Sequence, residues 1–228
     1  MVRKAVALLS GGLDSAVASA IAMSQGYRVY ALTVDYGQRH LRELEAAKAI
    51  AEALGVAGHR ILRVDLAGFG GSALTDASID VPETRPSEKI GSDIPITYVP
   101  ARNTVLLGLG LSWAEALGAD AVFIGAHSVD YSGYPDCRPE FFDAFRRVSA
   151  LGTRRGVEGR PISIEAPLIG MGKRGIIEKG RQLRVPFKLT WSCYLGGERA
   201  CGKCDSCVIR LRAFAEVGME DPIEYERK

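Results

Sequence analysis

The chain has 228 residues, 47% of them hydrophobic, and a formal net charge of +2. This length allows one compact enzyme domain with an appendage, and the hydrophobic content suffices for a full core. The near-neutral balance, without a lysine/arginine tail, argues against duplex nucleic acid as a partner, although a local basic patch is still compatible with it. Arg3 and Lys4 before an apolar stretch imitate a signal peptide, but Gly11, Gly12 and Asp14 interrupt that stretch, and no apolar run reaches the roughly 18 residues of a membrane span. We expect a cytoplasmic protein that does not enter a membrane.

Hydrophobic periodicity predicts alternating strands and helices along the chain. The apolar run at 5–9 predicts a first strand, and residues 16–22 fall in the helix that follows a glycine turn. The further expected strands are 28–35, 59–65, 121–127 and 162–166, and the further expected helices are 41–54, 103–117 and 207–217. This order predicts an α/β fold with a doubly wound parallel sheet. Ligands of such sheets collect beyond the carboxyl ends of the strands, which here are marked by Ser10, Asp35, Asp65, His127 and Ala166.

One long segment, residues 66–97, breaks the alternation. It is rich in Gly, Ser, Pro and Asp and has no clear period. Segments of this kind are usually lids, binding loops or disordered. We interpret this one as a mobile lid over the active site.

The most informative motif is Ser-Gly-Gly-Leu-Asp-Ser at 10–15, between the first strand and its helix. Gly11 and Gly12 let backbone N–H groups approach an anion, the helix N-terminus adds donors and partial positive charge, and Ser10 and Ser15 add hydroxyls. The chain has neither a P-loop lysine motif nor a G-x-G-x-x-G fingerprint at this place. A capped helix start alone would not require two glycines and Asp14. The motif resembles the PP-loop of the ATP pyrophosphatase superfamily, which implies that it holds a departing pyrophosphate with Mg²⁺ near Asp14.

Four cysteines, Cys193, Cys201, Cys204 and Cys207, follow a C-x₇-C-x₂-C-x₂-C pattern among glycines near the end of the sequence. Four thiolates at this spacing are typical of a structural, tetrahedral Zn²⁺ site. An iron–sulfur cluster is the alternative, whereas disulfides do not suit a cytosolic chain. We therefore divide the chain into an α/β domain at 1–187, with the nucleotide and catalytic site, and a small Cys₄ zinc-binding region at 188–228 packed on it.

Five sequence blocks narrow the resemblance. They are the phosphate motif, Asp-Tyr-Gly-Gln-Arg-His at 35–40, Tyr-Val-Pro-Ala-Arg-Asn at 98–103, residues 130–141 and the four cysteines. Together they resemble the 7-cyano-7-deazaguanine synthase family of queuosine biosynthesis over essentially the whole chain. The resemblance implies an adenine nucleotide alpha-hydrolase-like (Rossmann-like) fold, and an enzyme that converts 7-carboxy-7-deazaguanine and ammonia to the nitrile with ATP, Mg²⁺ and one structural Zn²⁺. It also implies a homodimer that acts on small molecules without direct contact to nucleic acid.

The same resemblance assigns the nucleotide site. The residues implied in ATP binding are Leu8, Leu9, Ser10, Gly11, Gly12, Leu13, Asp14, Ser15, Ala16, Val17, Ala18 and Asp35. Lys173, near the start of another helix, resembles a superfamily lysine that neutralises charge on the α-phosphate, and Arg102 could share that work. For both cations, the alternative is a solvated surface side chain. The catalytic set that we expect is Asp14, Lys173, Arg102 and His127, with His127 orienting ammonia or the amide unless it is merely structural.

We place the base pocket in the block at 130–141. A deazaguanine presents a planar ring and an edge of two donors, N1–H and the 2-amino group, so its recognition calls for an aromatic surface and a carboxylate. The candidates are Asp130, Tyr131, Tyr134, Asp136, Arg138 and Glu140, with Arg138 suited to the substrate carboxylate. The alternative is a tight turn with surface acids.

Cys137 stands apart from the cysteine cluster. It is either a nucleophile that forms a thioester or thioimidate, or a small contact in the base pocket, and we favour the contact because a free cysteine is usually inert packing.

Two other functions fit part of the pattern. One is a tRNA-modifying enzyme of the thiolation or lysidine type, for which the length and charge leave little room for an RNA-binding module. The other is a zinc-containing regulatory protein without turnover, which has no evident need for Mg²⁺ ligands beside the phosphates.

Overall fold

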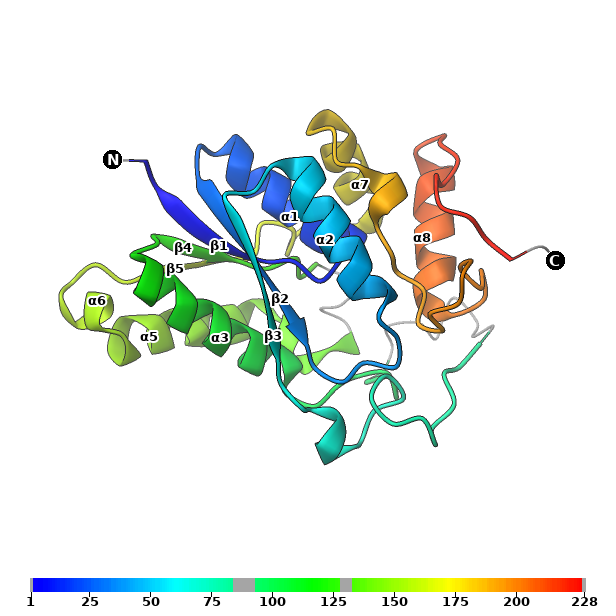
Figure 1. The fold of residues 1–228 in the computed structure, drawn as a ribbon, viewed down its shortest axis with the longest axis horizontal. Helices are drawn as coiled ribbons and strands as arrows, with labels where there is room; N and C mark the ends of the chain where they lie inside the picture. Colours follow the sequence, from blue (N-terminus) through cyan, green and yellow to red (C-terminus); the bar gives the residue numbers. More distant parts are fainter. Residues whose placement is uncertain (1, 84–92, 128–132, 227–228) are drawn as a thin grey trace.

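The computed structural model describes residues 2–83, 93–127 and 133–226 (Figure 1). The strands are β1 (Lys4–Leu8), β2 (Arg28–Asp35), β3 (Gly58–Arg63), β4 (Ala121–Phe123) and β5 (Ser163–Glu165). The α-helices are α1 (Leu13–Ser24), α2 (Arg42–Leu54), α3 (Arg102–Leu117), α5 (Pro139–Gly152), α6 (Arg154–Val157), α7 (Lys173–Gln182) and α8 (Asp205–Glu216). Three short 3₁₀ turns are η1 (Ala67–Phe69), η3 (Pro135–Cys137) and η4 (Phe187–Leu189).

The strands form one parallel sheet in the order β3-β2-β1-β4-β5. The chain winds outward from β1 to β3 and then crosses back beyond β1 to β4 and β5. The direction of winding therefore reverses between β1 and β4, and a crevice opens there at the carboxyl ends of the strands. The doubly wound parallel sheet predicted from the sequence is confirmed.

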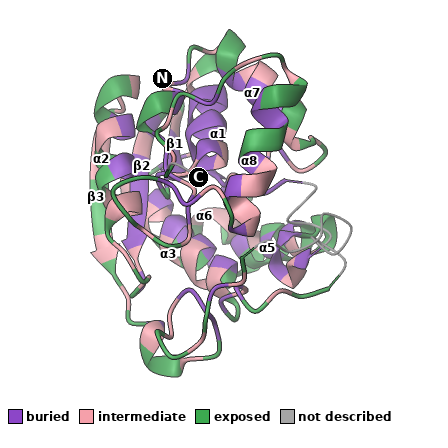
Figure 2. Cartoon of the chain, turned by 90° about the vertical axis from the view of Figure 1, so that its right-hand side faces the viewer, coloured by how far each residue is buried: buried purple, intermediate pink, exposed green. Residues whose placement is uncertain are grey.

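Helices cover both faces of the sheet, with α1, α2 and α7 on one side and α3 and α5 on the other (Figure 1). Side chains of a strand alternate between the two faces, and β1 uses this alternation to bury small and large residues on opposite sides. Ala5 and Ala7 pack with Phe123 and α1, whereas Val6 and Leu8 join the cluster beneath α3 and α5. Figure 2 shows the burial concentrated in α1 and the inner strands, while no residue of the edge strand β3 is buried.

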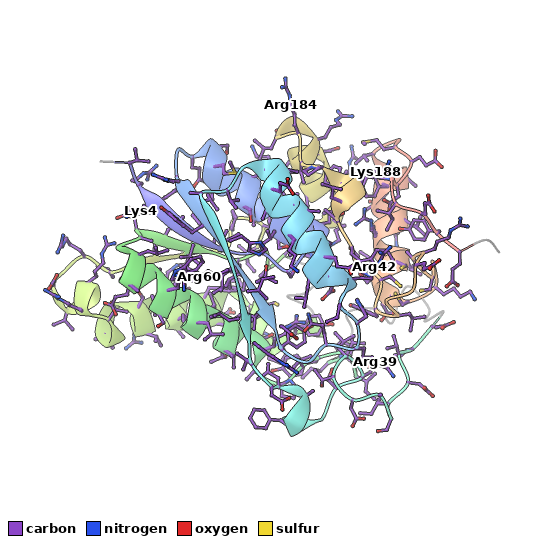
Figure 3. The ribbon with its side chains drawn as sticks, in the orientation of Figure 1. Lys4, Arg39, Arg42, Arg60, Arg184 and Lys188 are labelled. Carbon is purple, nitrogen blue, oxygen red and sulfur yellow. The ribbon has the colours of Figure 1, made fainter. Side chains whose placement is uncertain are left out.

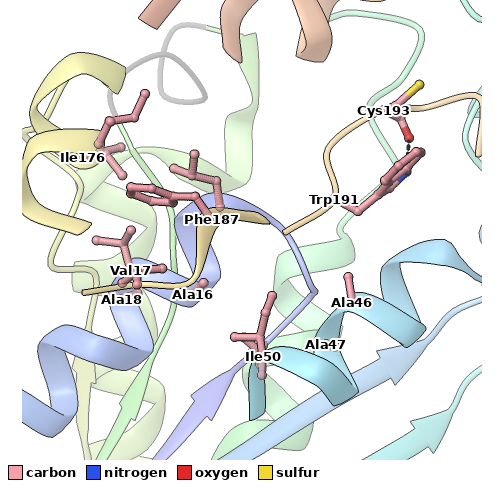
Figure 4. Close-up of a cluster of buried hydrophobic side chains, with 14 of the residues drawn as sticks. Ala16, Val17, Ala18, Ala46, Ala47, Ile50, Ile176, Phe187, Trp191 and Cys193 are labelled. Carbon is pink, nitrogen blue, oxygen red and sulfur yellow. Dashed lines mark hydrogen bonds between the residues drawn. The ribbon is translucent and has the colours of Figure 1, made fainter. Parts of the chain in front are cut away.

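A separate group of buried side chains joins α1, α2 and α7 to the C-terminal region (Figure 4). Phe187 packs beside α7 at Gly180, where a Cβ would lie 2.5 Å from the Phe187 ring. Trp191 and Cys193 extend the same cluster towards the N-terminal half of α2. The C-terminal region thus shares its core with the sheet-covering helices.

Several element boundaries differ from those predicted. The fourth strand ends at Phe123 rather than His127, because Gly125 comes so close to α1 that a Cβ there would lie 2.8 Å from the backbone of Asp14 and Ser15. Helices α5 and α6 were not predicted at all. The α5 sequence begins with Pro139 in its first turn, which favours a helix start, but the interpretation of residues 130–141 as the base pocket left this signal unused.

The described part of the segment 66–97 packs against the core. Ser72 and Ala73 are fully buried, the Ala73 N–H donates to the Ile96 carbonyl, and Leu74 reaches the crevice. The lid role stays a prediction. Within the described residues, none of the helices combines the length and the apolar character that a bilayer crossing needs.

Candidate active site and cysteine cluster

A pocket occupies the crevice at the carboxyl ends of β1, β2 and β4. Its floor is the phosphate motif and the first turn of α1, and one wall is the start of α3 with Tyr134 and Cys137. The opposite wall comes from Lys173 of α7 and from side chains of the C-terminal region, which are Trp191, Ser192, Tyr194, Ser206, Ile209 and Arg210. The predicted α/β domain (1–187) and the predicted zinc-binding region (188–228) therefore both line this pocket. The domain boundary at 187/188 stays a prediction.

Hydroxyl groups hold the phosphate motif in shape. The Ser15 hydroxyl donates to the Gly12 carbonyl (2.9 Å) and lies 3.0 Å from the Ser10 hydroxyl, which accepts the Gly12 N–H (3.3 Å). Gly11 has a φ of +91°, and a Cβ there would lie 2.1 Å from the Glu43 carbonyl oxygen. The need for glycine at this position thus comes from the close approach of α2.

The proposed ATP-binding residues divide into two groups. Those that line the pocket are Leu8, Leu9, Ser10, Gly12, Leu13, Asp14 and Ser15. Gly11, Ala16, Val17, Ala18 and Asp35 do not line it; Val17 and Ala18 are core residues, and the Asp35 carboxylate accepts the Gly37 N–H (3.3 Å).

Asp14, Lys173 and His127 meet at one end of the pocket. The Lys173 Nζ lies 2.8 and 2.6 Å from the two Asp14 carboxylate oxygens and 3.1 Å from His127 Nε2, which is 3.2 Å from Asp14 Oδ2. Burial disfavours the carboxylate, but the charges and hydrogen bonds of Lys173 and His127 outweigh burial and hold the pKa of Asp14 well below its usual range. Asp14 is therefore a stable anion beside a lysine cation at the N-terminus of α1.

Arg102 begins α3 on the other side of the pocket. Its guanidinium donates to the Tyr36 hydroxyl (3.2 Å) and lies 5.5 Å from the centre of the Tyr36 ring. Burial opposes its charge, but Tyr36, Tyr134 and Asp136 together raise the pKa of Arg102 above its ordinary value. The tyrosine thus orients a permanent cation towards the pocket.

The predicted base-binding residues are only partly brought together. Tyr134 lines the pocket and its hydroxyl lies 3.1 Å from that of Thr97, whereas Asp136 is buried with Oδ2 accepting the Asn103 N–H (3.0 Å). Arg138 and Glu140 are exposed and outside the pocket lining, and Asp130 and Tyr131 lie outside the described residues.

Cys137 is buried at the pocket wall and accepts a hydrogen bond from the Asn103 side-chain amide (3.2 Å). Both the packing role and the nucleophile role stay open predictions.

Sequence reasoning missed Glu43. This residue lies in the first turn of α2, its side chain lines the pocket, and burial raises the pKa of Glu43 to about 7 against the opposing charge of Arg102. Its position just after the block at 35–40, at the start of the helix that follows β2, was the available signal.

The four cysteines of the C-terminal pattern come together in the interior. Their Sγ atoms all lie within 4.8 Å of one another, and the Cys201 and Cys207 Sγ atoms are 3.9 Å apart. Cys201 Sγ accepts the N–H groups of Lys203 and Cys204, both at 3.3 Å. A tetrahedral ion with sulfur ligands at about 2.3 Å requires Sγ separations of about 3.8 Å, so the donor set fits one metal ion.

Hydrogen bonds connect this cluster to the phosphate motif. The Trp191 N–H donates to the Gly11 carbonyl (2.9 Å), and the Trp191 indole donates to the Cys193 carbonyl (3.0 Å). Arg42, labelled on α2 in Figure 3, places its guanidinium 4.9 Å from the centre of the Trp191 ring. The cysteine cluster thus fixes one edge of the pocket.

A parallel sheet of this order, with such a phosphate motif at its switch point, is typical of nucleotide-binding α/β enzymes of the PP-loop superfamily, and we place the chain in that class. The solved structure of NMN synthetase from Francisella tularensis has a similar fold, with a TM-score of 0.52 at 17% identity, covering 96% of this chain and 79% of that chain. The chain belongs to the family of queuosine biosynthesis protein QueC, whose model matches residues 4–218.

Curated relatives agree with this family. The 7-cyano-7-deazaguanine synthase of Anaeromyxobacter dehalogenans (strain 2CP-C) is 54% identical over 99% of this chain and 97% of its own length. The enzyme of the same name from Stutzerimonas stutzeri (strain A1501) is 56% identical over 98% of both chains. The family expected from the five sequence blocks is confirmed.

Proposed function

We propose that this chain is an ATP-dependent 7-cyano-7-deazaguanine synthase, which converts 7-carboxy-7-deazaguanine and ammonia to the nitrile in queuosine biosynthesis. The observation that carries the proposal is the similarity to relatives of that name, which are 54% and 56% identical to this chain over nearly its whole length. The pocket supports it, because the phosphate motif, Lys173 and His127 line one space together with the aromatic side chains Tyr36 and Tyr134.

The chemistry requires two activations in one site. A carboxylate resists ammonia because oxide is a poor leaving group, so an adenylyl group is transferred to the carboxylate oxygen and AMP leaves when ammonia forms the amide. The amide oxygen is then activated in the same way and lost, which leaves the nitrile. The task of the protein is therefore positioning and neutralisation of charge.

The pocket residues suit this task. Ser10, Gly12 and Ser15 would hold the β- and γ-phosphates at the N-terminus of α1, while Lys173 and Arg102 would neutralise the α-phosphate from opposite sides. His127, buried beside Lys173, is suited to orient ammonia or the amide.

Mg²⁺ and Zn²⁺ complete the proposal. The ionised Asp14 carboxylate, beside the phosphate motif, is an oxygen ligand of the kind that Mg²⁺ uses together with substrate phosphates, and the ion would supply further charge neutralisation there. The closed set of Cys193, Cys201, Cys204 and Cys207 suits a structural Zn²⁺ without an open position. We also infer a homodimer that acts on the free base in the cytoplasm.

The test is to incubate the protein with ATP, Mg²⁺, ammonium and 7-carboxy-7-deazaguanine and to follow the base and nucleotides by mass spectrometry. Nitrile with AMP and pyrophosphate is the expected result; nitrile with ADP would keep the function and overturn adenylation. An unchanged base would overturn the function and make tRNA the next substrate to try. Lys173→Ala should lower kcat by at least about 100-fold, whereas Lys188→Ala, an exposed lysine labelled in Figure 3, should leave it unchanged.

A further inference from the structure

The proposed function leaves one recognition element unassigned. The pyrimidine edge of a deazaguanine carries two adjacent donors, N1–H and the 2-amino group, and a carboxylate can accept both in parallel. A polar site that rejects analogues must hold such a partner in the pocket, with its oxygens free to bind the substrate.

The acids that the sequence pointed to do not meet this condition where the structure describes them. One carboxylate oxygen of Asp136 accepts the Asn103 N–H at the N-terminus of α3, and Glu140 is exposed and lies outside the pocket. Asp14 lines the pocket, but Lys173 and His127 engage it. Each of these carboxylates is committed elsewhere or is out of reach.

Glu43 meets the condition. Its backbone is fixed against the phosphate motif, since its carbonyl oxygen occupies the space that a Cβ on Gly11 would need. Its side chain lines the pocket and is partly buried, and among the described residues no hydrogen bond or ion pair engages its carboxylate. The nearby guanidinium of Arg102 is instead held by the Tyr36 hydroxyl.

The surroundings of Glu43 suit a planar base. Tyr36 and Tyr134 line the same pocket and supply aromatic surface, and Leu74 adds an apolar contact. A ring lying against these side chains would occupy the same pocket that Glu43 lines. Aromatic surface and a free carboxylate are the two groups that recognition of this base requires.

We propose that Glu43 is the specificity-determining residue of this site, and that its carboxylate accepts hydrogen bonds from N1–H and the 2-amino group of the deazaguanine substrate. This inference rests on the proposed function. It assigns recognition of the donor edge of the base to the first turn of α2, while Tyr134 of the block at 130–141 keeps a role as aromatic surface.

The experiment compares Glu43→Gln with Glu45→Gln, an exposed glutamate on the same helix that serves as the matched control. Steady-state kinetics are measured with 7-carboxy-7-deazaguanine and with its analogue lacking the 2-amino group. We expect Glu43→Gln to lower kcat/KM for the parent substrate on the order of 10- to 100-fold, since charged hydrogen bonds of this kind are worth about 1.5–3 kcal/mol. The loss for the analogue, which keeps N1–H but not the second donor, should be several-fold smaller. The preference for the 2-amino substrate should collapse, and the KM for ATP should not change.

Three results would overturn the inference: equal losses for both bases, a raised KM for ATP with the base KM unaltered, or a full preference for the 2-amino base in Glu43→Gln. Glu43→Asp, which keeps a carboxylate, should retain the preference with weaker binding, and this guards against a folding defect in the amide variant. If the unaltered protein forms no nitrile, the proposed function fails, and calorimetric binding of the two bases then decides the inference. Under that condition, the unaltered protein must still prefer the 2-amino base and Glu43→Gln must lose that preference; otherwise the inference fails too.

Discussion

A buried ion pair holds the C-terminal region together, and its removal has a calculable cost. The Arg210 Nε and Nη2 atoms lie 2.6 and 2.9 Å from the Asp221 carboxylate, and both side chains are only 1% exposed. Removing one partner of such a pair costs about 3–5 kcal/mol, because the other charge stays buried without compensation. We expect about 3 kcal/mol for Asp221→Asn, since Arg210 keeps its hydrogen bonds to the Thr190 hydroxyl and the Phe187 carbonyl.

Arg210→Met should cost about 4 kcal/mol, because the Asp221 carboxylate then keeps, among the side chains that the structure describes, only the Tyr225 hydroxyl (2.6 Å) as a partner. The assay is urea unfolding of the metal-loaded protein, followed by circular dichroism. Arg212→Met is the matched control: its partner Glu216 lies 3.0 Å away on the surface, so the change should be below about 0.5 kcal/mol. The double variant Arg210→Met/Asp221→Asn should be more stable than either single variant, because neither charge then stays buried alone. Destabilisation equal to the sum of the two would refute the reasoning, because the charges would then act independently.

Three further results are expected. Cys204→Ser should lower bound zinc, measured by atomic emission, below one ion per chain and lower the melting temperature; stoichiometric iron or an unchanged metal content would contradict the assigned site. Glu43→Gln should raise stability by about 3 kcal/mol at pH 8 but not at pH 4, because the pKa of Glu43 rises from 4.5 to about 7 on folding, so ionisation opposes the folded state progressively between these pKa values and fully above pH 7. Equal effects at both pH values would show that burial is not the cause. Gly125→Ala should push the N-terminus of α1 away and lower kcat/KM for ATP. The control is Gly118→Ala: Gly118 has open space around it but a left-handed φ of +61°, so this change should lower stability and leave kcat/KM for ATP unchanged.

The fold was predictable because the inner strands are almost entirely apolar and the helices that pack on the sheet carry apolar residues along one face. The second strand and the ends of α2 and α3 came within a residue of their observed positions, since burial of Val29, Ala47 and Leu107 in their clusters dictates the period. The error at β4 had a tertiary cause, because the apolar run continues to Ala126 while the sheet pairing stops where Gly125 meets α1. No local pattern reports such a contact.

The site was predictable only in part, for the same reason. The sheet order brings Asp14, His127 and Lys173 together, although Lys173 lies 159 residues after Asp14 in the sequence. The sequence motifs identified each of them only as a polar group at the end of a predicted strand or helix. Glu43 and Arg210 carry no motif of their own. Their place in the pocket depends on the path of the chain around Trp191, which hydrophobic periodicity does not encode.

That path explains why a structural cysteine cluster belongs to a catalytic fold. The Arg42 guanidinium stacks on the Trp191 ring. The Trp191 backbone N–H donates to the Gly11 carbonyl of the phosphate motif, and its indole N–H donates to the Cys193 carbonyl. The phosphate motif, the first turn of α2 and the cysteine cluster are thus three sides of one packed unit, so a displacement of any side moves the others. The proposed reaction, which activates two oxygens in succession in one site, would require the phosphates and the base to keep their relative positions through both steps. The wall that holds the four cysteines contacts the phosphate motif through Trp191, and a metal ion bound to these cysteines would make that wall rigid where the sheet itself ends.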